Sequence, residues 1–364
     1  MLHAVIMAGG TGTRFWPESR AQQPKQLLRM LGKTTMIRST VDRLGDLVPP
    51  DRVLVATTAS LAGRIADELS ELPREAILAE PCKRNTAPCI GLAAIYVSRS
   101  DPDATMAVMP ADHVIGPDEA FRDAVRFAAS LVEQQPERIV TFGVRPTYPA
   151  EVFGYIERGE SLEASASGSS ASPPVYRVAR FREKPNAGVA AEYVRSGDFY
   201  WNSGIFLWKA RTILDALGKH QPEMYRRLQR IADAAETSGF AEVLRQEFTA
   251  IKAISIDYAV MEHATDIVVV EASFDWDDLG SWQSLARLRG VDGDGNTITA
   301  KHLGLNTTGT IVRGGENHLI VTLGLKDCLV VHTPDATLVA NKHDEESIRQ
   351  VVAMLGEQGY GEYL

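Results

Sequence analysis

The chain has 364 residues, 45% of them hydrophobic, so it can bury at least one large core and is long enough for two domains. Its 38 Lys and Arg residues against 47 Asp and Glu residues give a formal net charge of −9, the wrong sign for a protein that binds nucleic-acid polymers. A small anionic substrate stays possible if the chain forms a local cationic pocket despite its negative net charge. Arg14, Lys25 and Lys184 are candidates for that pocket.

The three cysteines, Cys82, Cys89 and Cys328, form neither a disulfide framework nor a metal-ligand spacing. We therefore expect free thiols in a reducing, cytoplasmic compartment. The N-terminus has no basic region ahead of its apolar run, and Gly9 and Gly10 interrupt that run early. Neither a signal peptide nor a transmembrane span is predicted.

The first predicted element is a buried strand at residues 4–8, which the stretch GGTGTRFWPESRAQQPK follows directly, from Gly9 to Lys25. Three glycines just past a strand let the backbone turn tightly and aim its N–H groups at an anion. Arg14 and Lys25 add positive charge, and we expect Lys25 to face solvent. The stretch therefore predicts a phosphate cradle, although glycines at this place also suit an ordinary strand-to-helix turn.

Neither common phosphate motif fits this stretch. Phe15 stands where G-x-G-x-x-G needs its third glycine, and the Gly-Lys pair of the Walker pattern is missing from the stretch. A cradle of another kind is therefore required.

Strands and helices then alternate as far as residue 142. Short apolar runs predict strands, and apolar residues at helical spacing predict helices between them. The strands are expected at Arg52–Thr57, Ala76–Ala79, Thr105–Met109 and Arg138–Phe142, and the helices at Met36–Leu47, Leu61–Leu72, Thr86–Arg99 and Glu119–Gln134. This alternation argues for an α/β, doubly wound sheet that binds ligands at the carboxyl ends of its strands.

Two polar segments follow strands of this region. The segment EPCKRNTAP, Glu80 to Pro88, contains Asn85 and Thr86 as possible helix caps, so a well-made helix start is an alternative to a binding role. The segment PADH, Pro110 to His113, places Asp112 at a strand end, where a carboxylate can bind Mg²⁺ or merely cap a turn. His113 is a phosphate or metal neighbour, or an exposed loop histidine.

From Gly154 the pattern changes to strands with fewer helices. Strands are expected at Gly154–Glu157, Val175–Phe181, Ile205–Trp208 and Ile267–Val270, and helices at Ala187–Arg195 and Gln221–Ala235. The tract SLEASASGSSASPP between the first two strands cannot supply core and is expected to be a mobile loop.

Three further segments carry polar residues between aromatics or at strand ends. FREKP places Glu183 and Lys184, and WNSGIF places Asn202, where they can bind sugar hydroxyls and phosphate or simply end a strand. SFDWDDLGSW supplies Asp278 and two further aspartates on a turn, with an acidic surface loop as the alternative.

The last seventy residues read differently. A Gly-rich acidic linker is expected at Val291–Asp294, and a final helix at Asp344–Leu355. Between them short β-type runs recur at close spacing, at Gly309–Val312, His318–Thr322, Cys328–His332 and Thr337–Ala340. Spacing alone indicates a β-helix only weakly.

The string GGTGTRFWPESRAQQPKQLL resembles the signature of the sugar-nucleotide pyrophosphorylases, the nucleotidyltransferases that act on sugar 1-phosphates. Its Phe-Trp-Pro, Ser-Arg and Pro-Lys-Gln elements are most similar to the mannose-1-phosphate guanylyltransferase branch. The matched motifs run from Gly9 to Trp282.

The resemblance implies a fold and a division of the chain. It implies a Rossmann-like nucleotidyltransferase domain with a mixed, mainly parallel sheet at residues 1–288. It also implies a small, β-rich, left-handed β-helix-like domain at residues 295–364, with an association role in a homodimer. The Ser/Ala-rich insert after Glu160 departs from the family pattern. Because the sequence stops at Leu364, with no room for the isomerase domain fused to some relatives, a single activity is expected.

The resemblance also assigns residues. Arg14, Lys25 and Asp112 are implied as catalytic, and Asp112 and Asp278 as ligands of one Mg²⁺. The implied nucleotide-binding residues are Ala8, Gly9, Gly10, Thr11, Gly12, Thr13, Arg14, Lys25, Glu80, Asn85, Thr86, Ala87, Asp112 and His113. The implied sugar-phosphate-binding residues are Gly154, Tyr155, Glu183, Lys184, Asn202, Ser203 and Gly204.

The reaction that these residues imply is transfer of GMP from GTP to α-D-mannose 1-phosphate, which gives GDP-mannose and diphosphate. The same chemistry with another sugar 1-phosphate or nucleotide is one alternative. A catalytically silent homologue that binds a sugar nucleotide and regulates a partner is another, although Arg14, Lys25, Asp112 and Asp278 are all present.

Overall fold

The computed structural model describes residues 1–162 and 173–364, which group into two compact units. The first unit consists of Met1–Gly9, Val41–Ala111 and Ile115–Trp276, and the second of Gly10–Thr40, Asp112–Val114 and Asp277–Leu364. Packing thus groups the glycine-rich segment with the C-terminal region, whereas the sequence places the division near residue 288. Of the predicted loop at residues 161–174, residues 163–172 lie outside the described residues, and Ser161 and Leu162 belong to a strand, β7 (Tyr155–Leu162).

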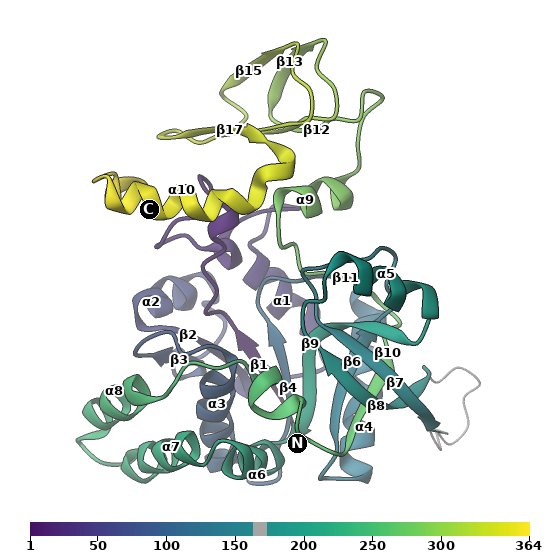
Figure 1. Cartoon of the computed structure of the whole chain (residues 1–364). Helices are drawn as coiled ribbons and strands as arrows, with labels where there is room; N and C mark the ends of the chain where they lie inside the picture. The colour runs from purple at the N-terminus through teal and green to yellow at the C-terminus, as the bar shows by residue number, and fades with distance from the viewer. Residues whose placement is uncertain (163–172) are drawn as a thin grey trace. The chain divides into compact units, whose positions relative to one another are not determined.

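The first unit is built on one mixed sheet, with strand order β3-β2-β1-β4-β9-β6-β10-β8-β7 (Figure 1). Its strands are β1 (Leu2–Met7), β2 (Val53–Thr58), β3 (Ile77–Glu80), β4 (Thr105–Pro110), β6 (Ile139–Val144), β7 (Tyr155–Leu162), β8 (Val175–Arg182), β9 (Phe199–Lys209) and β10 (Ile267–Glu271). Strands β3, β2, β1 and β4 are parallel to one another, as are β6 and β10, while β9 runs antiparallel to β4 and β6, and β8 runs antiparallel to β10. The predicted mixed sheet is confirmed.

The register brings the ends of the first strands to one edge of this sheet. Met7 pairs with Pro110, and Thr58 pairs with Glu80, so β1, β4, β2 and β3 all end there. Ala4, Val5 and Ile6 are completely buried, as expected for a strand covered on both faces. The segments that follow β1, β3 and β4 are therefore the ones that the sheet presents for binding.

The helices of the first unit pack on this sheet or on one another. They are α2 (Ala59–Glu68), α3 (Thr86–Ser100), α4 (Asp118–Gln134), α5 (Ala187–Ser196), α6 (Ala210–His220), α7 (Pro222–Ala234), α8 (Phe240–Ala250) and a π-helix at Asp257–Met261. Helix α3 packs against α6 and α7, and Gly91 allows the close approach, because a Cβ there would lie 2.5 Å from Leu228. Helix α4 instead contacts β4, β6 and β9. The sequence did not predict α6 and α8.

The second unit contains the C-terminal β structure. Its strands are β12 (Thr297–Thr299), β13 (Lys301–Leu305), β14 (Ile311–Arg313), β15 (Leu319–Leu323), β16 (Cys328–His332) and β17 (Thr337–Asn341). Strands β12, β14 and β16 are parallel, β13 and β15 form a second parallel pair, and β17 closes the first set in the antiparallel sense. Successive turns of chain thus stack on one another, as in a β-helix. The predicted final helix begins later, because a 3₁₀ segment at Lys342–Ser347 precedes α10 (Ile348–Glu357).

The glycine-rich segment shares a hydrophobic core with this β structure. Phe15 lies edge-on to Trp282 at the start of α9 (Trp282–Arg289), with ring centroids 5.0 Å apart. The same core contains Trp16, Leu28 and Met30 from the segment, and Leu285, Ile311, Leu329, Val331, Leu338 and Ile348 from the C-terminal region. An ion pair reinforces it, because Arg313 donates 2.6 Å and 3.1 Å hydrogen bonds to the two carboxylate oxygens of Glu18. The C-terminal β structure therefore anchors the segment that carries Arg14 and Lys25.

Three short elements complete the chain: α1 (Met36–Leu44), β5 (Val114–Gly116) and β11 (Asp275–Asp277). All three cysteines are free thiols, as predicted. Within residues 1–162 and 173–364, every helix is too short or too polar to cross a bilayer.

Candidate active site

The loop after β1 is shaped by a close approach between Gly12 and Lys25. Gly12 has φ 62°, ψ 32°, in the left-handed region, and a Cβ there would lie 2.3 Å from the Cβ of Lys25. The Ser19 hydroxyl donates a 2.8 Å hydrogen bond to the Gly12 carbonyl and fixes the turn. Glycine at position 12 is therefore required both by the backbone and by the space that Lys25 takes.

Lys25 is buried, with 5% of its surface exposed, so the expectation that it faces solvent is wrong. Its Nζ lies 2.9 Å from Asp112 Oδ2 and donates a 2.6 Å hydrogen bond to the main-chain carbonyl of Asp278. The lysine joins three separate parts of the chain, which gives it a structural role beside any role in binding. Its charge is held at a fixed point.

Asp112 and Asp278 lie close enough for their charges to interact. Burial favours neutral Asp112, but Lys25 and His113 outweigh burial and lower its pKa. Burial is also the largest cause acting on Asp278, and there the pKa is raised, since the charges of Asp277 and Asp112 add to burial and Lys25 only partly opposes them. Two hard carboxylates that repel each other in one place suit a divalent cation.

The neighbouring aspartates of the same turn point elsewhere. Asp277 accepts a 2.7 Å hydrogen bond from the Leu279 amide and a 3.2 Å bond from Arg287, while Asp275 is exposed. Asp278 accepts a 2.9 Å bond from the Gly280 amide through Oδ1. Asp277 is thus held by donors of its own turn and helix, whereas Asp278 interacts electrostatically with Asp112 and Lys25.

Arg14 and Lys25 line one hollow of about 230 Å³, and all of it belongs to the second unit. Its lining residues are Thr11, Gly12, Thr13, Arg14, Phe15, Lys25, Asp112, His113, Asp278, Gly280 and Arg349. Arg14 donates a 3.2 Å bond to the Gly280 carbonyl, and its Nε lies 2.8 Å from Glu346 Oε1. The hollow combines turned backbone, cations and two carboxylates, as a polyphosphate with a metal ion would require.

Sequence reasoning missed Arg349, which lines this hollow, and Glu346, which pairs with Arg14. They lie more than sixty residues beyond the last matched motif, and no local pattern marks them. Only the packing of the C-terminal helix brings them to the glycine-rich segment.

The predicted base-binding residues belong to the first unit. Glu80 ends β3, is 4% exposed, and lies near Gly9, where an added Cβ would be 3.7 Å from Glu80 Oε2. Burial raises the pKa of Glu80 to about 7, although a hydrogen bond with Cys89 opposes the shift. Its Oε1 has no hydrogen-bond partner among the described residues. An unsatisfied carboxyl oxygen at the binding edge of the sheet is suited to accept from a ligand donor.

The segment after Glu80 begins α3, as the capping residues predicted. Asn85 adopts φ 68°, and its Oδ1 accepts a 2.8 Å bond from the Thr86 amide. The Thr86 hydroxyl accepts a 2.8 Å bond from the Ile256 amide, and Ala87 is completely buried. The Thr86 and Ala87 side chains thus serve the fold.

Ala8 directly follows β1 and is hydrogen-bonded to the neighbouring strand β2. It donates a 2.7 Å bond to the Ala56 carbonyl and accepts a 3.0 Å bond from the Thr57 hydroxyl. The chain then passes through Gly9 to Gly10, which is exposed.

The predicted sugar-phosphate residues gather around Gly154 in the first unit. A Cβ at Gly154 would lie 2.7 Å from Glu183 Oε2 and 3.5 Å from Asn202 Cβ, so the glycine makes room for both. The Asn202 amide is fixed at both ends: it donates 2.9 Å to Asp257 Oδ1, and its Oδ1 accepts a 3.2 Å bond from the Gly204 amide. The structure places Asp257 in this group, which sequence reasoning missed.

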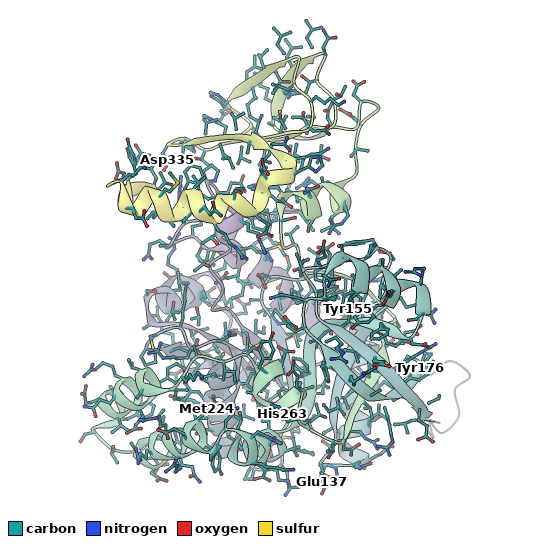
Figure 2. The ribbon with its side chains drawn as sticks, viewed as in Figure 1. Glu137, Tyr155, Tyr176, Met224, His263 and Asp335 are labelled. Carbon is teal, nitrogen blue, oxygen red and sulfur yellow. The ribbon has the colours of Figure 1, made fainter. Side chains whose placement is uncertain are left out.

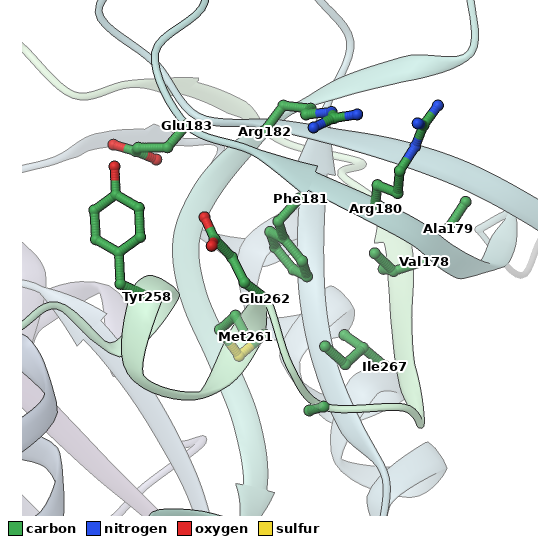
Figure 3. A pocket seen from close by; sticks show the side chains of 11 residues that line it. Val178, Ala179, Arg180, Phe181, Arg182, Glu183, Tyr258, Met261, Glu262 and Ile267 are labelled. Atoms are coloured by element: carbon green, nitrogen blue, oxygen red, sulfur yellow. The ribbon is translucent and has the colours of Figure 1, made fainter. Parts of the chain in front are cut away.

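Asp257 opens the π-helix, and burial, followed by the charge of Glu183, raises its pKa to about 6. Nearby, β8 and the segment Tyr258–Ile267 line a hollow of about 470 Å³. Figure 3 shows Glu183 and Tyr258 pointing toward each other at one end of it. Lys184, 64% exposed, lies 3.3 Å from Glu183 Oε1 and can turn to an anion.

Two of the predicted sugar-site side chains point into the fold. Tyr155, labelled in Figure 2, is completely buried and donates a 2.9 Å bond to the Ala150 carbonyl. Ser203 is completely buried as well, and its hydroxyl accepts a 3.3 Å bond from the Ile205 amide. Only their main chains remain for a ligand.

Comparison with known proteins identifies the family of this chain. Residues 3–291 match the model of the nucleotidyl transferase family, and residues 300–355 that of the MannoseP isomerase/GMP-like β-helix domain. The chain is 37% identical over 366 residues to mannose-1-phosphate guanylyltransferase from Escherichia coli, covering 100% of this chain and 76% of that protein. It is also 37% identical over 361 residues to the xanthan biosynthesis protein XanB from Xanthomonas campestris pv. campestris (strain B100), covering 98% and 74%.

Two solved structures are similar over most of their length. A protein from Thermus thermophilus described as a mannose-1-phosphate geranyltransferase has a TM-score of 0.84 and 33% identity, covering 98% of this chain and 99% of that one. A Helicobacter pylori protein described as a mannose-6-phosphate isomerase has a TM-score of 0.60 and 28% identity, covering 76% and 99%. The chain belongs to the nucleotidyl transferase family, in its mannose-1-phosphate guanylyltransferase branch.

Proposed function

We propose that this protein transfers GMP from GTP to α-D-mannose 1-phosphate and releases diphosphate and GDP-mannose. The proposal rests on family membership and, above all, on one observation: Lys25 is held between Asp112 and the Asp278 carbonyl beside the turn at Gly12. That arrangement suits polyphosphate chemistry, and the relatives' names supply the sugar and the base.

The reaction needs neither a general base nor a covalent protein intermediate. An oxygen of the sugar phosphate is already an anion, so it attacks the α-phosphorus directly, while the bond to the leaving diphosphate breaks in line with it. The protein must align the two substrates and neutralise charge. In the proposed scheme Arg14, Lys25 and the amides of residues 11–13 bind the phosphates that leave.

Enzymes of this family generally use a divalent metal ion. Asp112 and Asp278 fit such an ion, because two hard carboxylates line the same hollow and a lysine offsets only part of their charge. We propose Mg²⁺, which would neutralise phosphate charge when bound. Of the 354 described residues, no three His, Cys, Asp or Glu side chains form a metal cluster, so substrate phosphates or water would complete its coordination.

The proposed sugar site uses Glu183, Asn202 and Lys184. Asp257 orients the Asn202 amide, and Gly154 has no side chain that would cover Glu183. Both Asn202 and Glu183 can therefore face sugar hydroxyls. Lys184 would pair with the sugar phosphate. For the base we propose Glu80, whose buried carboxyl can accept from the donor edge of guanine.

We also propose a homodimer formed through β13 and β15. Leu303, Leu305, Leu319, Val321 and Leu323 are each 49–68% exposed on the same face of this pair, whereas Ile320 and Thr322 between them are buried. A face of five large apolar side chains, with Lys301 opposite Leu319 at one end, is suited to pair with the same face of a second copy. Light scattering should give a dimer for the natural chain and a monomer for Leu305→Glu with Leu323→Glu. A natural chain that is monomeric at micromolar concentration would contradict this.

The proposed activity is tested with the purified chain, Mg²⁺, GTP and mannose 1-phosphate, by separating GDP-mannose and quantifying diphosphate. We expect product with GTP and mannose 1-phosphate at a kcat/KM well above that for glucose 1-phosphate or for ATP. Binding of GDP-mannose without any turnover would instead support the silent regulatory homologue. A cytoplasmic location also stays a prediction.

A further inference from the structure

The C-terminal helix contributes a cation to the phosphate hollow. Arg349, in the first turn of α10, lines the hollow with Arg14, Lys25, Asp112 and Asp278. It lies outside residues 3–291, which match the nucleotidyl transferase family, and inside the β-helix match at 300–355. The part of the chain that matches the nucleotidyl transferase family therefore does not contain every charged residue that lines the phosphate hollow.

The cations around the hollow differ in how firmly ion pairs and hydrogen bonds hold them. Lys25 is 2.9 Å from Asp112 and bonded to the Asp278 carbonyl, and Arg14 is 2.8 Å from Glu346 and bonded to the Gly280 carbonyl. Arg349 is 54% exposed and meets its nearest carboxylate, Glu346, at 3.9 Å. Among the cations lining this hollow it is the one most loosely held, so it can turn toward an incoming anion at the lowest cost.

The carboxylate of Glu346 shows how a negative group can bind between Arg14 and Arg349. Its carboxylate already lies against the Arg14 guanidinium and within ion-pair distance of Arg349, so the two arginines face the same negative group. A phosphate offers the same kind of oxygen with more charge, and arginine binds phosphate through several donors at once.

We propose that Arg349 is a phosphate-binding residue of the nucleotide site and contacts the phosphates that leave as diphosphate. The inference rests on the proposed function for the identity of the nucleotide. It assigns to the C-terminal helix a direct part in substrate binding, beyond the association role expected for that region.

The test compares Arg349→Gln with Lys326→Gln, which removes the same charge from an exposed position of the same region outside the hollow. Losing a charged hydrogen bond to phosphate should raise the KM for GTP about tenfold or more, and leave the KM for mannose 1-phosphate within about twofold. In the reverse direction the KM for diphosphate should rise by a similar factor. Arg349→Lys should recover part of the loss, and Lys326→Gln should behave as wild type.

Calorimetric titration with GTP and with GMP separates this inference from the proposed activity. Arg349→Gln should bind GTP about tenfold more weakly and GMP as wild type does, even if wild type shows no transfer. Equal losses for GTP and GMP, or a melting temperature lowered by several degrees and not restored by Arg349→Lys, would show a structural role and overturn the inference. Unchanged GTP affinity would overturn it as well.

Discussion

The phosphate region and the sugar region of this protein are built in different ways. In the second unit, three separate stretches of chain meet at Lys25, Arg14 and Asp278, and ion pairs together with a shared core hold them. In the first unit, the group around Gly154 brings together Glu183 after β8, Asn202 on β9 and Asp257 on the π-helix, and one glycine and one amide orientation shape it. Charge therefore serves fold and site together in the phosphate region, while in the sugar region the fold is secured by the sheet.

This difference predicts where substitutions separate binding from stability. A buried phosphate-region cation such as Lys25 should affect both, because its partners are also structural. A sugar-region cation such as Lys184, which is 64% exposed, should affect binding alone.

The largest expected effect comes from truncation after Leu288. The sequence suggests that the removed part serves association, but it supplies Ile311, Leu329, Val331, Leu338 and Ile348 to the core around Phe15. We expect complete loss of turnover together with loss of cooperative thermal unfolding. Leu305→Glu alters only an exposed apolar side chain and should keep both. A truncated chain that melts and turns over as the full chain does would break the comparison.

Lys25→Met should have the next largest effect. Removing a fixed charge from the phosphates should lower kcat by about 100-fold or more. Leaving Asp112 without its partner should lower the free energy of unfolding by about 2 kcal/mol. Thermal melting and steady-state kinetics on one preparation measure both. A loss of activity with unchanged melting would show that the ion pair adds nothing to the fold.

Lys184→Met provides the contrast from the sugar region. The KM for mannose 1-phosphate should rise about tenfold, while melting and the KM for GTP stay near wild type, because the exposed side chain contributes little to folding. If the KM for GTP rose instead, the assignment of Lys184 to the sugar phosphate would be wrong.

Glu80→Gln should change stability in a way that depends on pH. The pKa of Glu80 is raised from 4.5 to about 7, so the folded state holds a proton that the unfolded state has released between these values. Stability is therefore lost as pH rises from 4.5 to about 7, by on the order of 3 kcal/mol in total. Glu80→Gln should melt a few degrees above wild type at pH 8 and level with it near pH 4. Exposed Glu75→Gln is the matched control and should show no such trend.

Much of the fold could be predicted because its signals are local. Apolar runs located β2, β4, β6 and β10 to within a residue or two at their first positions, and Asn85 marked the start of α3. Helices α6 and α8 were missed, since tertiary packing against α3 and α7 supports them more than any clear pattern does.

The candidate site was predicted unevenly for the same reason. The glycine turn and the aspartates lie in short motifs, so their neighbourhood could be expected. The burial of Lys25, the inward side chains of Tyr155 and Ser203, and the presence of Asp257, Glu346 and Arg349 depend on partners far away in sequence. Residue type and spacing along the sequence do not indicate such distant partners.

The central claim is that Asp112 and Asp278 together hold one divalent ion for the nucleotide phosphates. Manganese binding, followed by electron paramagnetic resonance with a nonhydrolysable GTP analogue, measures it directly, with Asp277→Asn as the matched control from the same turn. We predict one tightly bound ion in wild type and in Asp277→Asn, and affinity weakened by about 100-fold or more in both Asp112→Asn and Asp278→Asn. Wild-type manganese affinity in either of those two variants would contradict the shared site.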